Sequence, residues 1–129
     1  MPRAMVKCAE ELHVFQRALD LARDVSAILK RRGFRETPRL KDQIGSSSTA
    51  VAALIAEGFS LSTDRHFAQL LYRSRSESAE TRAHLRIANA RGHVTQSELD
   101  DLLARYNEVE KMLTGLIRYL QQQDRTDRG

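Results

Sequence analysis

The chain has 129 residues, of which 41% are hydrophobic and 29% charged, so residues 1–129 can form one domain with an apolar core. It has no apolar run of about 18 residues, which excludes a membrane-spanning helix. It has one cysteine, Cys8, which excludes an internal disulfide. The single cysteine and the lack of a secretory apolar segment at the start favour the cytoplasm. The net charge of +4 is compatible with nucleic-acid contact, but many cytoplasmic proteins share this balance.

The first expected helix covers residues 7–32. Apolar residues recur along it at spacings of three and four, which place them on one side of a helix. They form two neighbouring lines, and together these make a face too wide for a two-helix seam: Leu12, Phe15, Leu19, Ala22 and Leu29, and beside them Val14, Ala18, Leu21, Val25 and Ile28. Gly33 is the expected stop, because basic side chains and a following glycine are typical of helix ends.

The second expected helix covers residues 38–57 and follows a loop at residues 33–37. Thr37 can cap its first turn, and Pro38 suits its first helical position. Gly45 in its interior costs about 1 kcal/mol relative to alanine, which close packing would explain.

The end of this second helix, residues 50–58, is apolar almost all round, and its side chains are mostly small. A helix of this kind has to be buried on more than one face. We therefore expect a central helix that the other helices surround and that a second subunit contacts.

Gly58 is expected to end the second helix, and a third helix is expected over residues 63–91. Ser62 or Thr63 is its expected cap and Gly92 its stop. Its inner line is small and polar in the middle, which favours close approach of another helix; the line comprises Phe67, Leu71, Ser74, Ser78, Thr81, Leu85 and Ala88.

The fourth expected helix covers residues 95–121. Thr95 and Glu98 match a capping box, and Val94 and Leu99 match a hydrophobic staple. Heptad spacing follows along Leu99, Leu102, Tyr106, Val109, Leu113, Leu116 and Leu120. The polar residues after this helix are expected to fray. Four amphipathic helices with short connections predict an all-α fold, an antiparallel up-down four-helix bundle.

One short motif in the second expected helix, Ile55-Ala56-Glu57-Gly58, is the most specific part of a resemblance to a known family. The chain resembles the four-helix-bundle proteins named for the intervening sequences of 23S rRNA genes, which have an asparagine followed by the same four residues. The resemblance runs from about Leu12 to Leu120. Its other matches are Leu12, Val14, Phe15, Gln16, Ala18, Leu21, Leu40, Gln43, Ile44, Phe67, Leu71, Arg75, Glu80, Leu85, Ala88, Met112, Leu113 and Ile117.

The resemblance implies a homo-oligomeric ring, with the pentamer as the typical form of the family. It also implies association with RNA or DNA, because proteins that look like distant relatives serve as nucleic-acid-binding accessory factors of diversity-generating retroelements. It implies no enzymatic activity. The chain departs from the family pattern at Gly45 and Ser46, where two arginines are common, and at Leu54, where the asparagine would stand.

Glu57 and Glu80 are candidates for a functional carboxylate pair, since they come from different helices and each matches a family motif. Arg75 is a possible partner for either. The alternative is structural: each carboxylate accepts hydrogen bonds and fixes the register of its helix.

No metal site, cofactor or small-molecule substrate is expected. Glu10 and His13 form one Glu-x-x-His pair, but a carboxylate di-iron bundle needs two such pairs and further glutamates. Glu80 and His84 lie one turn apart, a common coincidence. Cys8 is expected to be an ordinary buried or terminal thiol.

Basic residues are the strongest functional candidates, because phosphate binding needs positive side chains displayed together. One group surrounds the turn between the first two expected helices, and three arginines lie on the third: Lys30, Arg31, Arg32, Arg35, Arg39 and Lys41, then Arg73, Arg82 and Arg86. Solvated surface charges or intersubunit salt bridges are the alternative. Aromatic residues for single-strand stacking are not interleaved with them.

The leading hypothesis is a non-enzymatic, ring-forming protein that binds RNA or DNA through these basic residues. The alternative is a protein-binding or structural scaffold without a nucleic-acid role. Under both hypotheses, Ala53→Arg is expected to disrupt packing or assembly, because it places a charge in the small apolar segment of the second helix.

Overall fold

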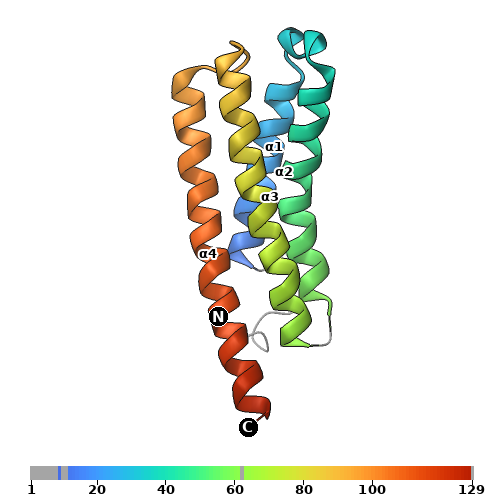
Figure 1. Ribbon diagram of the computed structural model, residues 1–129, viewed down its shortest axis with the longest axis vertical. Coiled ribbons are helices and arrows are strands. Elements are labelled where there is room, and N and C mark those ends of the chain that lie inside the picture. Colours follow the sequence, from blue (N-terminus) through green and yellow to red (C-terminus); the bar gives the residue numbers. More distant parts are fainter. Residues whose placement is uncertain (1–8, 10–11, 62, 129) are drawn as a thin grey trace.

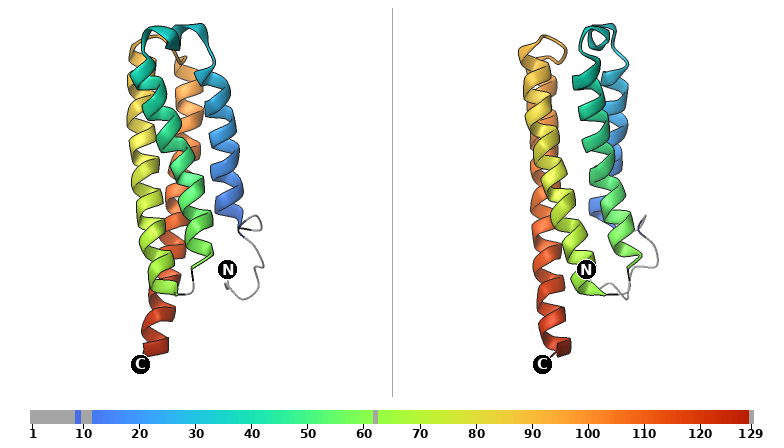
Figure 2. Two further views of the ribbon diagram at one scale, coloured as in Figure 1. Left: turned by 90° about the vertical axis from the view of Figure 1, so that its right-hand side faces the viewer. Right: turned by 45° about the vertical axis from the view of Figure 1, so that its right-hand side comes forward.

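The computed structural model describes residue 9 and residues 12–61 and 63–128. These form four α-helices, a short 3-10 helix and no strand: α1 (His13–Leu29), η3 (Arg32–Glu36), α2 (Pro38–Phe59), α3 (Asp64–Ala90) and α4 (Gln96–Arg128). The four α-helices lie alongside one another, and the connections between them alternate between the two ends of the molecule (Figures 1 and 2). The predicted all-α, four-helix fold is confirmed. None of the described helices is long and apolar enough to cross a bilayer.

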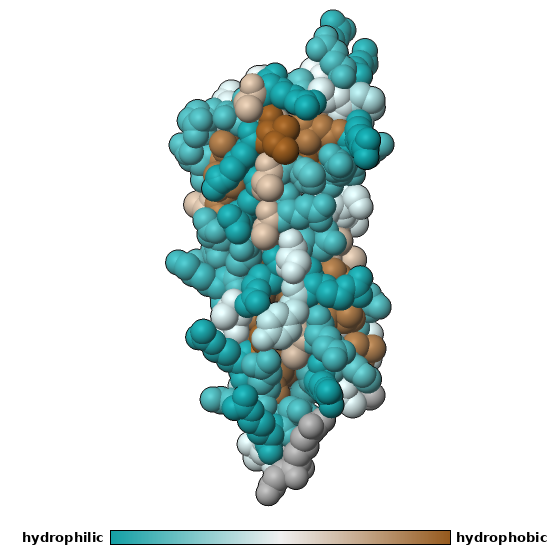
Figure 3. Space-filling model, viewed as in Figure 1, coloured by the Kyte–Doolittle hydropathy of each residue, from teal (hydrophilic) through white to brown (hydrophobic). Residues whose placement is uncertain are grey.

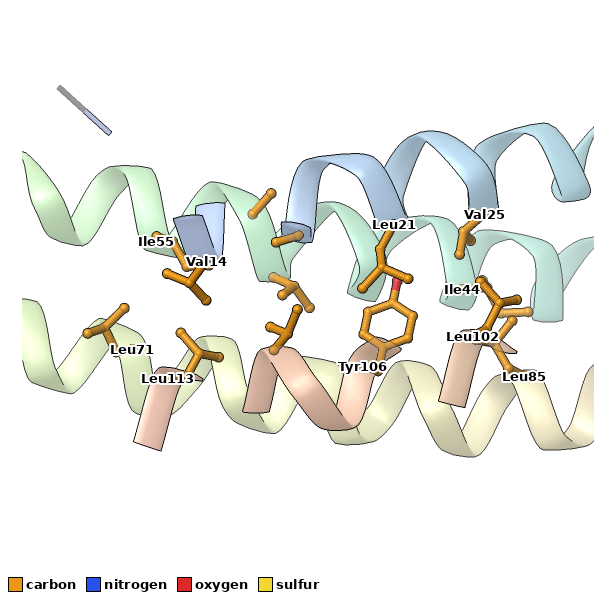
Figure 4. Close-up of a cluster of buried hydrophobic side chains, with 14 of the residues drawn as sticks. Val14, Leu21, Val25, Ile44, Ile55, Leu71, Leu85, Leu102, Tyr106 and Leu113 are labelled. Carbon is orange, nitrogen blue, oxygen red and sulfur yellow. The ribbon is translucent and has the colours of Figure 1, made fainter. Parts of the chain in front are cut away.

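The core runs the length of the helices. Figure 4 shows side chains from all four helices pointing toward one another, among them Val14, Leu21, Val25, Ile44, Ile55, Leu71, Leu85, Leu102, Tyr106 and Leu113. Of the two lines expected on the first helix, the line from Val14 to Ile28 is buried, whereas Leu19 is 42% exposed. Burial raises the pKa of the Tyr106 phenol, and its oxygen has no hydrogen-bond partner among the described residues.

The heptad expected on α4 holds at every position except Leu116, and Leu120 is buried as expected. Ile117 is buried in the core, whereas Leu116 is only half-buried. An α-helix has 3.6 residues per turn, so a strict seven-residue repeat drifts by about 20° per heptad. This drift is consistent with Ile117 facing the core in place of Leu116, after which Leu120 is again buried.

Two of the expected helix starts are confirmed by their caps. The Thr63 hydroxyl accepts a hydrogen bond from the His66 amide at 3.2 Å. Thr95 and Glu98 form the reciprocal capping box, with distances of 3.2 and 2.9 Å. Gly92 ends α3 with a φ of 81°, a conformation that favours glycine. The expected Thr37 cap is wrong, since its side chain makes no cap hydrogen bond.

Three helix ends differ from the expected ones. α1 ends at Leu29 rather than residue 32, and η3 replaces the expected loop, because this turn places the Phe34 ring in the core. Gly58 lies inside α2 and does not end it. α4 continues to Arg128 and extends beyond the α2–α3 connection, as Figures 1 and 2 show. Residues 121–128 contain neither proline nor glycine, so nothing in that stretch breaks the helix.

The contact between α2 and α3 is lined with hydroxyl groups, as the small polar residues of the third helix predicted. Ser74 and Thr81 are fully buried. The Ser74 hydroxyl donates to the Val51 carbonyl oxygen at 2.7 Å, and the hydroxyl oxygens of Thr81 and Ser47 lie 2.7 Å apart. Short side chains that bond across the seam allow the two helices to approach closely.

The expectation of a central helix that the other helices surround is wrong for the single chain, because one side of residues 50–58 faces solvent. Leu54 and Ile55 are buried, but Ala53 faces solvent, and Ala50 and Ala56 are half-buried. The bundle covers the large apolar side chains of this segment and leaves mainly small ones outside. Ala53→Arg therefore cannot disturb the core of one chain, and whether it disrupts assembly depends on which face a second copy covers.

Alanine substitutions at Gly58 and Gly45 are expected to change stability in opposite directions. A Cβ atom at Gly58 would lie 2.8 Å from Phe67 Cδ1 and 3.3 Å from Leu70 Cβ, so Gly58→Ala should destabilise the fold by about 1–3 kcal/mol. At Gly45 the nearest atom, Leu29 Cδ1, would be 3.6 Å away, an ordinary contact. Gly45→Ala should therefore stabilise α2 by up to about 1 kcal/mol.

Urea unfolding of both variants measures this difference. Equal midpoints would contradict the close contact at Gly58. The expectation that close packing explains Gly45 is wrong within the chain.

Candidate nucleic-acid interface

The η3 helix is held against the end of the bundle by the turn between α3 and α4. Phe34 is fully buried, and its ring centroid lies 4.7 Å from that of His93. Thr37 Oγ1 lies 3.1 Å from His93 Nε2. A Cβ at Gly33 would come within 2.9 Å of His93 Nδ1, so a glycine lets the ring lie against η3. Residues 30–41 are therefore presented on a structured segment.

All six basic residues predicted around this turn are exposed, and five of them have no ion-pair partner in the part of the chain that the structure describes. These five are Lys30, Arg32, Arg35, Arg39 and Lys41. Only one carboxylate, Glu36, lies within residues 30–41. This end of the molecule therefore carries a concentrated positive charge.

Arg31 differs from these five because it has a structural role. Its guanidinium donates to both carboxylate oxygens of Glu98, with Nη1 at 2.9 Å from Oε1, and to the His93 carbonyl oxygen at 3.2 Å. The hydrogen bond from Arg31 lowers the pKa of Glu98 to about 2. Arg31 therefore ties the start of η3 to the capping box of α4. Sequence patterns identified Glu98 as a cap but could not identify its partner, 67 positions away.

The three arginines predicted on the third helix do not join this cluster as one surface. Arg82 is half-buried and makes two hydrogen bonds to Glu110, at 2.7 and 2.9 Å, so its charge is compensated. Arg73 and Arg86 are exposed, but thirteen residues of helix separate them by about 20 Å. Of the three, only Arg86 lies toward the η3 end.

The structure does not bring Glu57 and Glu80 together. Glu80 is next in sequence to Thr81, which lies level with Ser47 of α2, and ten residues of α2 place Glu57 about 15 Å farther along that helix. Both carboxylates are exposed. Arg75 pairs with neither, since it donates to Thr114 Oγ1 at 3.0 Å and lies 4.8 Å over the Tyr72 ring.

Among the described residues, no three His, Cys, Asp or Glu side chains gather where they could hold a metal ion. Glu80 Oε1 and His84 Nε2, one turn apart on α3, are separated by 3.5 Å. Cys8 and Glu10 lie outside the described residues.

Two grooves flank α3 and carry opposite charges. The groove between α3 and α4, about 600 Å³, is lined by Arg75, Lys111 and Arg118. The groove between α2 and α3, about 370 Å³, is lined by Asp42, Glu77, Glu80 and one cation, Arg39. Sequence analysis missed Lys111 and Arg118, although their spacing of seven residues places them on one face of a helix.

Comparisons with known proteins agree with this architecture. The family model for 23S rRNA-intervening sequence proteins matches residues 10–115. A crystal structure of a protein of unknown function, from the S23 ribosomal protein family of Bacteroides thetaiotaomicron, superposes with a TM-score of 0.73 at 20% identity, covering 81% of this chain and 97% of that one. At this identity the match shows the fold alone. No curated protein matches the sequence.

Proposed function

Because the chain belongs to the family of 23S rRNA-intervening sequence proteins, we propose that it is a non-enzymatic, homo-oligomeric bundle protein that binds RNA or DNA through its η3 end. The observation that carries the proposal is the cluster of exposed cations at residues 30–41, a stretch that contains one carboxylate, Glu36. Phosphate contacts depend mainly on such charge and need no base-reading motif.

The local fold supports this function. Phe34 and His93 hold η3 in place, so the backbone that carries its cations is fixed before a ligand binds. This lowers the entropic cost of binding. The N-terminus of α2 lies in the same segment and adds the partial positive charge of a helix end. We propose that copies of this antiparallel up-down bundle assemble into a ring, which is the pentamer expected from the resemblance. Each copy contributes one cationic end to the ring. Cytoplasmic location stays a prediction.

The test is fluorescence anisotropy with labelled random RNA and DNA across a salt series. A variant carrying Arg32→Gln, Arg35→Gln and Lys41→Gln should bind more weakly to every sequence. For duplex DNA, the slope of log affinity against log salt should fall by about 3, roughly one for each cation that no longer pairs with a phosphate. The matched control removes three exposed cations elsewhere through Arg17→Gln, Arg65→Gln and Arg125→Gln.

The two variants have the same net charge, so a difference between them reports position rather than total charge. If wild-type protein fails to bind at about 50 mM salt, nucleic-acid binding is refuted. If both variants lose the same affinity, binding is not located at η3.

One observation favours the alternative, a scaffold that binds other protein subunits. Tyr72 and Ile87 are large apolar side chains on α3 that the chain leaves exposed. The two functions are compatible, since the η3 end and the outer side of α3 are different surfaces.

A further inference from the structure

The outer side of α3 carries a largely apolar line that the described part of the chain leaves exposed, apart from Arg75 and Gln121, which contact Tyr72. Tyr72 and Ile87 are 41% and 42% exposed. Ser76, Ala79 and Ala83 lie between them, and all are exposed. The spacings of three and four place all five residues on one side of the helix. Figure 3 shows this line as white, tan and brown residues running down the middle of the molecule over α3, with hydrophilic residues on both sides.

The side of this line that faces α2 is acidic. Glu77 and Glu80 lie close enough to interact, and with Asp42 they outnumber the one cation, Arg39, that lines the α2–α3 groove. Burial and the neighbouring charge of Glu80 raise the pKa of the Glu77 carboxyl, and the charge of Arg73 opposes this rise. Two carboxylates this close repel each other, so cations from outside the chain would relieve an unfavourable interaction.

The side of the line that faces α4 is basic. Arg75, Lys111 and Arg118 line the α3–α4 groove, and the one carboxylate there, Glu110, is bonded to Arg82. Hydrogen bonds from Arg75 to Thr114 and from Ser78 to Glu110 show which residues of α3 and α4 lie at the same height along the bundle. Lys111 therefore lies at the height of Glu77, on the other side of the apolar line.

We propose that this face of α3 docks a second copy of the chain, with the two α3 helices parallel. In a parallel contact, the acidic side of one copy meets the basic side of the other at the same height. In an antiparallel contact, acidic sides would face each other and Glu80 would meet its own counterpart, which like-charge repulsion disfavours. In a ring, each copy turns its acidic side to one neighbour and its basic side to the next, so two different sides meet and the same contact repeats around the ring.

This inference rests on the homo-oligomer of the proposed function and assigns its interface. The first experiment exchanges charges. A copy with Glu77→Lys and Glu80→Lys has two basic sides, and a copy with Arg75→Glu and Lys111→Glu has two acidic sides. Each alone should lose self-association by at least about tenfold, whereas an equimolar mixture should associate again, in species of even copy number because the two kinds of copy must alternate, as sedimentation velocity measures.

The second experiment compares two exposed alanines on different helices. Ala83→Arg, in the middle of the apolar line, should weaken self-association by at least about tenfold, because it places a charge in the contact. Ala53→Arg, on the outer side of α2, should leave the mass unchanged. Both positions face solvent in the single chain, so circular dichroism should show the same helix content in both variants.

Orientation is measured with a spin label at Arg65→Cys in a Cys8→Ser background. Parallel copies place the two labels at the same end, separated sideways by one or two helix diameters of about 10 Å. Antiparallel copies would separate them by about 45 Å along the helices.

The outcomes distinguish the two proposals. A wild-type protein that sediments as a monomer refutes the homo-oligomer and this interface with it. A wild-type oligomer that Ala83→Arg leaves intact, or that Ala53→Arg dissociates, overturns the interface alone.

Discussion

Ser74→Leu is expected to lower the free energy of unfolding by about 2–4 kcal/mol. Ser74 is fully buried between α2 and α3, and its hydroxyl donates to the Val51 carbonyl oxygen at 2.7 Å. The substitution removes a hydrogen bond worth about 1 kcal/mol. It also forces a larger side chain into a packed seam, and overpacking of this kind costs a further 1–3 kcal/mol, roughly.

Urea unfolding followed by circular dichroism measures the loss. Ser74→Ala separates the two causes, since it removes only the hydrogen bond and should cost about 1 kcal/mol. Ser46→Leu is the matched control, because the same change is made at an exposed position of α2 and should be nearly neutral. Wild-type stability of Ser74→Leu would show that the two helices do not approach closely at this point.

Glu110→Ala is the second large effect, with an expected loss of about 2–3 kcal/mol. The carboxylate accepts two hydrogen bonds from Arg82 and one, at 2.7 Å, from the buried Ser78. The side chains of Arg82 and Glu110 are only 24% and 17% exposed, so water can replace the lost partner only in part. Removing one member of such a pair leaves a partly buried charge without its counterion.

A double-mutant cycle tests the origin of this loss. If the unpaired arginine causes it, Glu110→Ala combined with Arg82→Ala should be less destabilised than the sum of the single variants. Glu108→Ala removes an exposed carboxylate from the same helix and should change stability by less than about 0.5 kcal/mol. Equal effects of Glu108→Ala and Glu110→Ala would argue against the ion pair.

The candidate site illustrates how far residue patterns reach. The concentration of cations at residues 30–41 is visible in the sequence, because it needs only residue types and their order. Whether each cation is available depends on what lies opposite. Arg31 and Arg82 carry the same charge as Arg32 and Arg35, but only the first two have carboxylates brought to them by folding. Those partners lie 67 and 28 positions away, beyond any local pattern.

The opposite charges on the two sides of α3 show the same limit. Glu80 and Arg75 lie on one helix and are visible as charges, but Asp42 and Lys111 join them only when α2 and α4 pack against α3. The resemblance to the family directed attention to Glu57 and Glu80 as a pair. Their separation along the bundle follows from the heights at which α2 and α3 meet.

By itself, the sequence determined that the chain forms four helices, where most of them begin and which hydroxyl-bearing residues line the inside of α3. These features depend on local periodicity, capping residues and glycines, whose effects act within one or two turns. Only the tertiary structure decided which side of α2 is exposed to solvent, which arginines have no ion-pair partner and where an apolar face is left uncovered. These depend on the rotation and height of one helix against another, and packing of the whole bundle sets both.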